Sequence, residues 1–116
     1  HQSYLEELVA QRDQATQVVP EGSLVLANRH FSKLLEVPRP ELPSYRLPRY
    51  EHHGRLLEGA RAQARAEAQP YYLVHLRRRP SEALPEAWSE LVRELGGEVV
   101  HEGPLLVIRR VTPPRR

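Results

Sequence analysis

The spacing of apolar residues along the chain predicts helices and strands in alternation. Apolar residues recur every three or four positions over residues 3–17, as they do on one face of an amphipathic helix. Ser3, followed three residues later by Glu6, has the pattern of a capping box at the start of that helix. An unbroken apolar run at 23–27 follows a Pro-Glu-Gly break and is typical of a buried strand. We therefore expect a helix and then a strand.

The middle of the chain continues this alternation. Asn28 comes directly after the first strand and can cap a helix that ends before Pro38. Prolines flank residues 44–47, and this favours a strand at the edge of a sheet. The segment 51–69 is rich in Ala, Arg and Glu, and this predicts a helix that stops at Pro70.

The last third of the chain carries the clearest patterns. Residues 71–76 predict a third strand, and a helix that opens at Ser81 or Leu84 should follow and end at the glycines 96 and 97. Trp88 lies on the apolar stripe of that helix, so we expect it in the core. Residues 98–101 and 105–109 are separated by a tight turn, and this predicts a hairpin with an antiparallel last strand.

This element order predicts one three-layer α/β domain over residues 1–111, with a flexible Pro/Arg tail at 112–116. We expect a mostly parallel, Rossmann-like sheet with helices on both faces and an antiparallel edge strand from the C-terminal hairpin. Right-handed crossovers favour the strand order 2-1-3-4-5, which places the Pro-flanked strand at an edge. The order 3-2-1-4-5 remains open.

The composition excludes a membrane-spanning helix and all chemistry that needs cysteine. The chain has 116 residues, 40% of them hydrophobic, and no apolar run approaches the roughly 18 residues of a membrane helix. No Cys is present, so disulfides and thiolate chemistry are excluded, and Asp13 is the single aspartate. Lys33 is the single lysine among 17 basic residues, an Arg-rich, thermophile-like composition. Because the sequence contains no Met, we expect an excised piece of a longer chain.

Polar residues gather where the strands of this sheet should end. Ligands of open parallel sheets bind beyond the carboxyl ends of the strands, and guanidinium groups there favour phosphate or carboxylate. The alternative is that these loops are simply solvated. The candidate ligand-binding residues are Asn28, Arg29, His30, Arg49, His52, Arg77, Arg78 and His101.

Other chemistries find little support in the sequence. The histidines 52, 53, 75 and 101, with Glu51 and Glu102, show no zinc-ligand spacing, so we predict no metal site. No serine lies in a nucleophile elbow, and no glycine-rich loop follows the first strand, so we predict neither a catalytic residue nor a cofactor. The run Arg77-Arg78-Arg79 lacks interleaved aromatic residues, and we expect no nucleic-acid partner.

One resemblance covers most of the chain. The segments 19–26, 71–74 and 99–110 resemble the extramembrane region of polytopic glycosyltransferases that use lipid-phosphate sugars, the dolichyl-phosphate-mannose protein mannosyltransferase-like group. In that family the catalytic acids lie in the membrane part, so the resemblance implies an accessory domain and gives no catalytic residue here. It also implies that the parent reading frame encodes several apolar runs of about 20 residues.

Two functions therefore stand as hypotheses. The first is a non-catalytic accessory or interaction domain of a larger glycosyltransferase-like protein, with the remainder of the parent chain as its partner, on the extramembrane face of a membrane. The second is a stand-alone, cytoplasmic α/β module that binds a small phosphorylated or carboxylated ligand at the carboxyl ends of the strands.

Overall fold

The computed structural model describes residues 2–35 and 69–113. The predicted strand at 44–47, nearly all of the predicted helix at 51–69 and the end of the predicted tail, 114–116, lie outside this part of the chain. The elements are helix α1 (Gln2–Val18), strand β1 (Val25–Ala27), helix α2 (Arg29–Leu35), strand β2 (Tyr71–Leu76), helix α4 (Glu86–Leu95), strand β3 (Glu98–Glu102) and strand β4 (Leu106–Val111).

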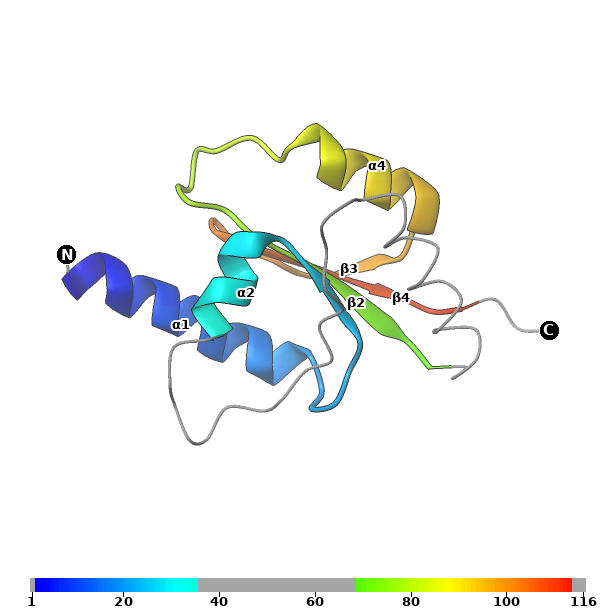
Figure 1. The fold of residues 1–116 in the computed structure, drawn as a ribbon, viewed down its shortest axis with the longest axis horizontal. Helices are drawn as coiled ribbons and strands as arrows, with labels where there is room; N and C mark the ends of the chain where they lie inside the picture. The colour runs from blue at the N-terminus through cyan, green and yellow to red at the C-terminus, as the bar shows by residue number, and fades with distance from the viewer. Residues whose placement is uncertain (1, 36–68, 114–116) are drawn as a thin grey trace.

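The described elements form three layers. A single mixed sheet lies in the middle, with α4 over one face and α1 and α2 over the other (Figure 1). The predicted α/β class with helices on both faces is thus confirmed. Within the described residues, no helix is both long enough and apolar enough to cross a membrane.

The order of the strands differs from the prediction. The described sheet runs β1-β2-β4-β3, with β1 and β2 parallel and both pairings of β4 antiparallel. The predicted orders 2-1-3-4-5 and 3-2-1-4-5 are therefore wrong, and so is the expectation of a mostly parallel sheet. The C-terminal hairpin forms as expected, but its last strand lies between two others and β3 takes the edge.

Burial explains why β4 takes the inner position. Residues 106–108 are buried, whereas β3 exposes Glu98 and Glu102 and carries an irregularity between Val99 and His101. An inner strand is covered on both faces, while charges and bulges are typical of edge strands. Helix α4 connects β2 to β3, and these two strands are not neighbours in the sheet. Strand β4 lies between them, as in a split β-α-β unit.

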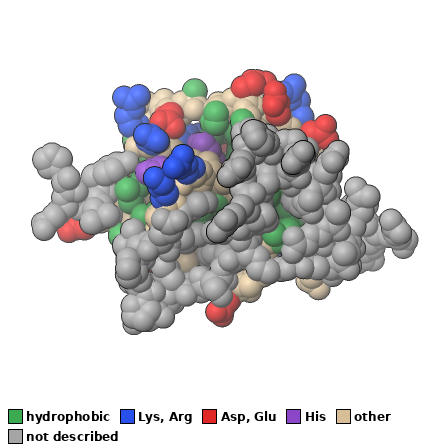
Figure 2. All heavy atoms as spheres, in the orientation of Figure 1, with side chains coloured by type: hydrophobic (Ala, Val, Ile, Leu, Met, Phe, Trp, Pro, Cys, Tyr) green, Lys and Arg blue, Asp and Glu red, His purple; other side chains and the backbone are tan. Residues whose placement is uncertain are grey.

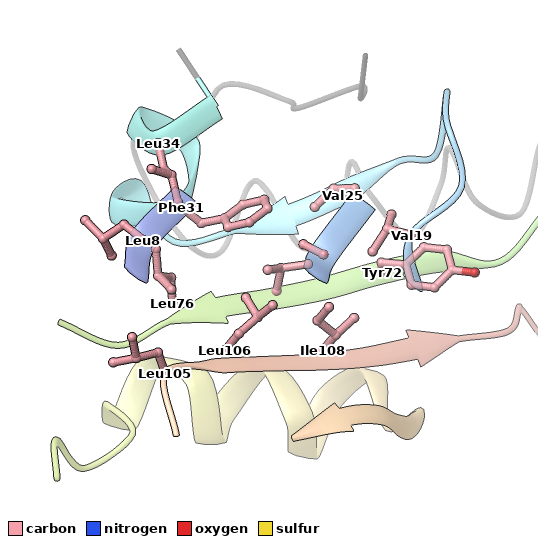
Figure 3. Packing of buried hydrophobic residues seen from close by; sticks show 12 residues of the cluster. Leu8, Val19, Val25, Phe31, Leu34, Tyr72, Leu76, Leu105, Leu106 and Ile108 are labelled. Atoms are coloured by element: carbon pink, nitrogen blue, oxygen red, sulfur yellow. The ribbon is translucent and has the colours of Figure 1, made fainter. Parts of the chain in front are cut away.

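Strand β2 lies in the centre of the described sheet, and all six of its residues are buried. Tyr71 and Tyr72 are adjacent in the strand and both are buried, because each face of the sheet carries a helix layer. Tyr72 belongs to the core beneath α1 and α2, shown in Figure 3, and Tyr71 belongs to the core beneath α4. Because successive side chains of a strand point to opposite faces, β2 contributes to the core on each side of the sheet.

Two helix starts differ from those predicted. Helix α1 includes Ser3, so Ser3 is not its cap. Helix α4 begins at Glu86, after Pro85 at the N-cap position with extended backbone angles. A proline restrains the residue before it to extended backbone, so the helix cannot include Leu84. Leu84 still packs on the core beneath α4.

The short link from α4 to β3 depends on glycine. Gly97 has a φ of 91°, and a Cβ added there would lie 2.7 Å from the carbonyl oxygen of Arg110. The Arg109 side chain of β4 donates to the carbonyl oxygens of Gly96, at 3.3 Å, and Gly97, at 2.8 Å. The link is therefore held close against the strand that fills the middle of the sheet.

Candidate functional site at the carboxyl ends of β1 and β2

The carboxyl ends of the parallel strands β1 and β2 lie together, and the chain leaves them in two ways. After β1 it enters α2 through Asn28, and after β2 it enters the loop 77–85 that leads to α4. Figure 2 shows Lys/Arg, His and Asp/Glu side chains gathered on the visible face near this loop and α2. This is the edge of the sheet at which the sequence placed a ligand site.

Asn28 joins the two strand ends through its side chain. Its amide nitrogen donates to the carbonyl oxygen of Leu76 at 2.9 Å, and its amide oxygen accepts from the backbone N–H of Leu76 at 3.0 Å. These two bonds extend the β1–β2 pairing by one step beyond the strand. Because buried backbone groups need partners, these bonds give Asn28 a structural role at the strand ends.

Arg77 holds the end of β2 against the β3–β4 turn. Its Nη1 donates to the carbonyl oxygens of Gly103, at 3.3 Å, and Pro104, at 3.4 Å, and its backbone N–H donates to Leu105 at 2.8 Å. Its Nε is buried and has no hydrogen-bond partner in the described part of the chain. Arg77 thus ties the end of β2 to the β3–β4 turn, while its Nε–H makes no hydrogen bond within the described residues.

His75 is the one polar residue in the otherwise apolar strand β2 apart from the tyrosine hydroxyls, and it is only 6% exposed. Its ring lies 5.7 Å from the Trp88 ring of α4, centroid to centroid, tilted by 52°. Its Nε2 has no hydrogen-bond partner among the described residues. Burial lowers the pKa of His75, and the positive charges of Arg77 and His30 add to this against the raising effect of Glu82.

His30, in the first turn of α2, is half-buried and resembles His75 in one respect. Its Nε2 is also buried and has no partner in the described structure. Burial lowers the pKa of His30, Arg78 lowers it further, and Glu82 opposes them. The lowered pKa values favour the neutral form of both imidazoles, and the Nε2 atom of each is buried without a hydrogen-bond partner among the described residues.

These residues form what we call the rim cluster: His30, His75, Arg77, Arg78 and Glu82. The charges of these residues act on one another. Arg78 and Glu82 shift the pKa of His30, and Glu82, Arg77 and His30 shift the pKa of His75. Glu82 accepts a long hydrogen bond from the backbone N–H of Arg78, at 3.5 Å. Arg78 is exposed, and so are its neighbours outside the cluster, Arg29 and Arg79. Cationic donors thus outnumber the one carboxylate.

The remaining predicted site residues lie elsewhere. Arg49 and His52 lie outside the described residues. His101 of β3 pairs with Ile108, whose side chain belongs to the core beneath α1 and α2, whereas His75 contacts Trp88 on the opposite face. Paired residues project to the same side of a sheet, so His101 is separated from His75 by the sheet. No three His, Asp or Glu groups among the described residues gather as a metal site would require.

The structure thus brings together His30, Arg77 and Arg78 of the predicted residues and adds His75 and Glu82, which the prediction omitted. A lone histidine in a buried apolar strand was a usable signal for His75. No pattern in the sequence indicated Glu82, because its position depends on how the loop after β2 folds. A turn brings it back, and the Glu82 N–H donates to the carbonyl oxygen of Arg79 at 3.0 Å.

The buried histidine predicts a pH dependence of stability. Above the ordinary histidine pKa of 6.5, His75 is neutral in the folded and the unfolded chain, so it adds no pH dependence. Below it the unfolded chain binds the proton more readily, because the folded pKa is lowered. We expect the free energy of unfolding to fall by at most about 1.4 kcal/mol per pH unit for this group as the pH drops below 6.5.

Chemical denaturation at a series of pH values measures this effect. The variant H75F should have a flatter profile than the wild-type chain, and H101F, on the other face, provides the matched control. Identical slopes for the wild type and H75F between pH 6.5 and about pH 5 would contradict the assignment.

Comparison of the chain with protein-family models, with curated proteins and with solved structures finds no match. The resemblance to lipid-phosphate-sugar glycosyltransferases therefore remains a prediction.

Proposed function

We propose that the chain is a non-catalytic accessory module that holds a small phosphorylated or carboxylated ligand at the rim cluster. The observation that carries this proposal is the buried Nε2 of His30 at the carboxyl end of the strands, which has no hydrogen-bond partner among the described residues. The positive charge of Arg78 also acts on this imidazole and lowers its pKa. A buried polar atom without a partner is costly, and binding sites are where such atoms are retained.

The charges around the cluster favour an anion. Arg77, Arg78 and the exposed neighbours Arg29 and Arg79 are permanent cations, and Glu82 is the one carboxylate of the cluster. Guanidinium groups present paired donors that match the oxygens of phosphates and carboxylates. Neutral imidazoles add donors or acceptors according to tautomer. A ligand with several anionic oxygens suits this set better than a cation or an apolar molecule.

The accessory role is supported by the resemblance described above. In that setting the rest of the parent chain is the partner of this module, and the parent reading frame should encode several apolar runs of about 20 residues. A parent frame without them would contradict the membrane-bound version of the proposal and leave the anion site unaffected.

Ligand titration tests the anion site. Sulfate, inorganic phosphate and sugar phosphates, added to millimolar concentration, should shift the amide NMR resonances of residues 28–30 and 77–82. The double variant R29A/R78A should weaken this binding by about 10-fold or more, since it removes two charge-assisted donors. Arg77 is not suitable for this test because its side chain braces the β3–β4 turn.

The control is R93A, which removes an exposed arginine of α4 that pairs with Glu86 at 3.0 Å. It should bind as the wild-type chain does. Sulfate and phosphates that leave the resonances of both segments unmoved, or a loss equal in R93A and R29A/R78A, would contradict the proposed site.

A further inference from the structure

The environment of His30 contains two features that disfavour its protonated form. Its Nε2 is buried and faces no acceptor in the described part of the chain, so a proton placed there would lack a hydrogen-bond partner. Arg78 adds a like charge, and together burial and Arg78 lower the pKa of His30. A charged group buried without a partner is strongly destabilised.

A bound oxyanion would reverse both features. One of its oxygens can accept a hydrogen bond from Nε2–H, and its negative charge compensates that of Arg78. Glu82 already supplies part of this negative charge, but it acts against burial and Arg78 without overcoming them. The ligand would therefore supply the acceptor that Nε2 of His30 lacks among the described residues, and a further negative charge beside it.

On this basis, and resting on the proposed function, we propose that His30 takes up a proton when the oxyanion binds, so that anion binding at the rim cluster strengthens as the pH falls. The bound state is an imidazolium–oxyanion pair beside the guanidinium group of Arg78. The neutral imidazole of the free chain becomes charged without any covalent step.

The like charges of the two histidines disfavour the uptake of a second proton, and the remaining groups around them are few. His75 and His30 repel each other when charged, and His75 is enclosed by the indole of Trp88 on α4. On β4 its cross-strand neighbour is Val107, and the next residue in that row is Glu102 of β3. Helix α1, packed on α2, contributes the Arg12–Asp13 ion pair, with the Nε and Oδ1 atoms 3.9 Å apart. Loop 77–85 contributes Arg77, Arg78, Arg79 and Glu82.

Sulfate is the probe of choice, because it remains a dianion across the histidine range and any pH dependence must come from the protein. Its dissociation constant, measured by calorimetry or NMR from about pH 8 to about pH 5.5, should fall as the pH falls, by at most about tenfold per pH unit. In parallel, the Hε1 resonance of His30 should titrate at a higher pH with saturating sulfate than without it.

Two histidine variants assign the effect. In H30Q sulfate binding should become independent of pH, whereas H101Q, altered on strand β3 outside the rim cluster, should retain the wild-type profile. The Hε1 titration uses the wild-type chain, so it shows whether His30 takes up a proton on sulfate binding even if H30Q fails to fold.

The two proposals fail in different ways. If the wild-type chain binds no sulfate at any pH, the proposed function is overturned and this inference with it. If sulfate binds with the same affinity at every pH, or if the His30 titration does not move, the proton linkage is overturned and the anion site stands. A pH dependence that persists in folded H30Q would overturn the assignment to His30.

Discussion

Trp88→Ala should lower the free energy of unfolding by roughly 3–5 kcal/mol, one of the two largest effects we expect from a single substitution in this chain. Trp88 is 7% exposed and is the only tryptophan in the sequence. It is the one buried residue of α4 and packs on the core that α4 forms with the sheet. Its removal takes a large apolar surface out of that core and leaves a cavity that the rigid sheet cannot close.

Thermal unfolding followed by circular dichroism measures this loss, and the melting temperature should fall by roughly 15 °C or more. S89A, at an exposed position on the same helix, should change the melting temperature little. In the variant, water should also reach His75, whose ring packs against the indole, so the pKa of His75 should rise back toward 6.5. A wild-type melting temperature for W88A would contradict the packing of α4 on the sheet.

Phe31→Ala should cost a similar roughly 3–5 kcal/mol on the other side of the sheet. Phe31 is 1% exposed and projects from α2 into the core between the helices and the strands, as Figure 3 shows. Helix α2 has only seven residues, too few to be stable by itself, so its position depends on Phe31 and Leu34. Loss of the phenyl ring should therefore loosen α2 and also displace His30, one residue earlier.

Urea denaturation followed by Trp88 fluorescence reports this loss from the opposite face of the sheet. A two-state transition at lower urea would show that both cores unfold together. The control K33A substitutes an exposed residue of the same helix by a better helix former and should not destabilise the chain. If F31A and K33A unfold at the same urea concentration, Phe31 is not the anchor of α2.

Local patterns in the sequence were sufficient to predict most of the described elements. The bounds of β2 match the predicted 71–76, because this buried strand is apolar at every position except His75 and has clear breaks at both ends. The order of the strands could not be predicted in this way. Whether β3 or β4 takes the inner position depends on which strand can be covered on both faces, a property of the assembled sheet.

The edge of the sheet that carries the candidate site could be predicted from the topology. Which residues form the site could not be predicted in this way. The expectation that ligands approach the carboxyl ends of parallel strands leads directly to His30 and Arg78. Asn28 was assigned to the same set because polar residues at strand ends look alike in a sequence, whether they bond to a ligand or to a neighbouring strand. Only the register of β1 against β2 shows that the Asn28 amide reaches Leu76.

The inner position of β4 has a consequence for the order in which this domain can form during synthesis. A ribosome delivers α1, β1, α2 and β2 long before β4, and β3 pairs with no described strand other than β4. Until residue 111 has left the exit tunnel, β2 therefore presents one open edge and β3 has no described partner. Strand pairing across such distances along the chain is slow, since the loops must close before the contacts stabilise them. The described sheet therefore forms as a whole only after β4, the last of its four strands along the chain, has been translated.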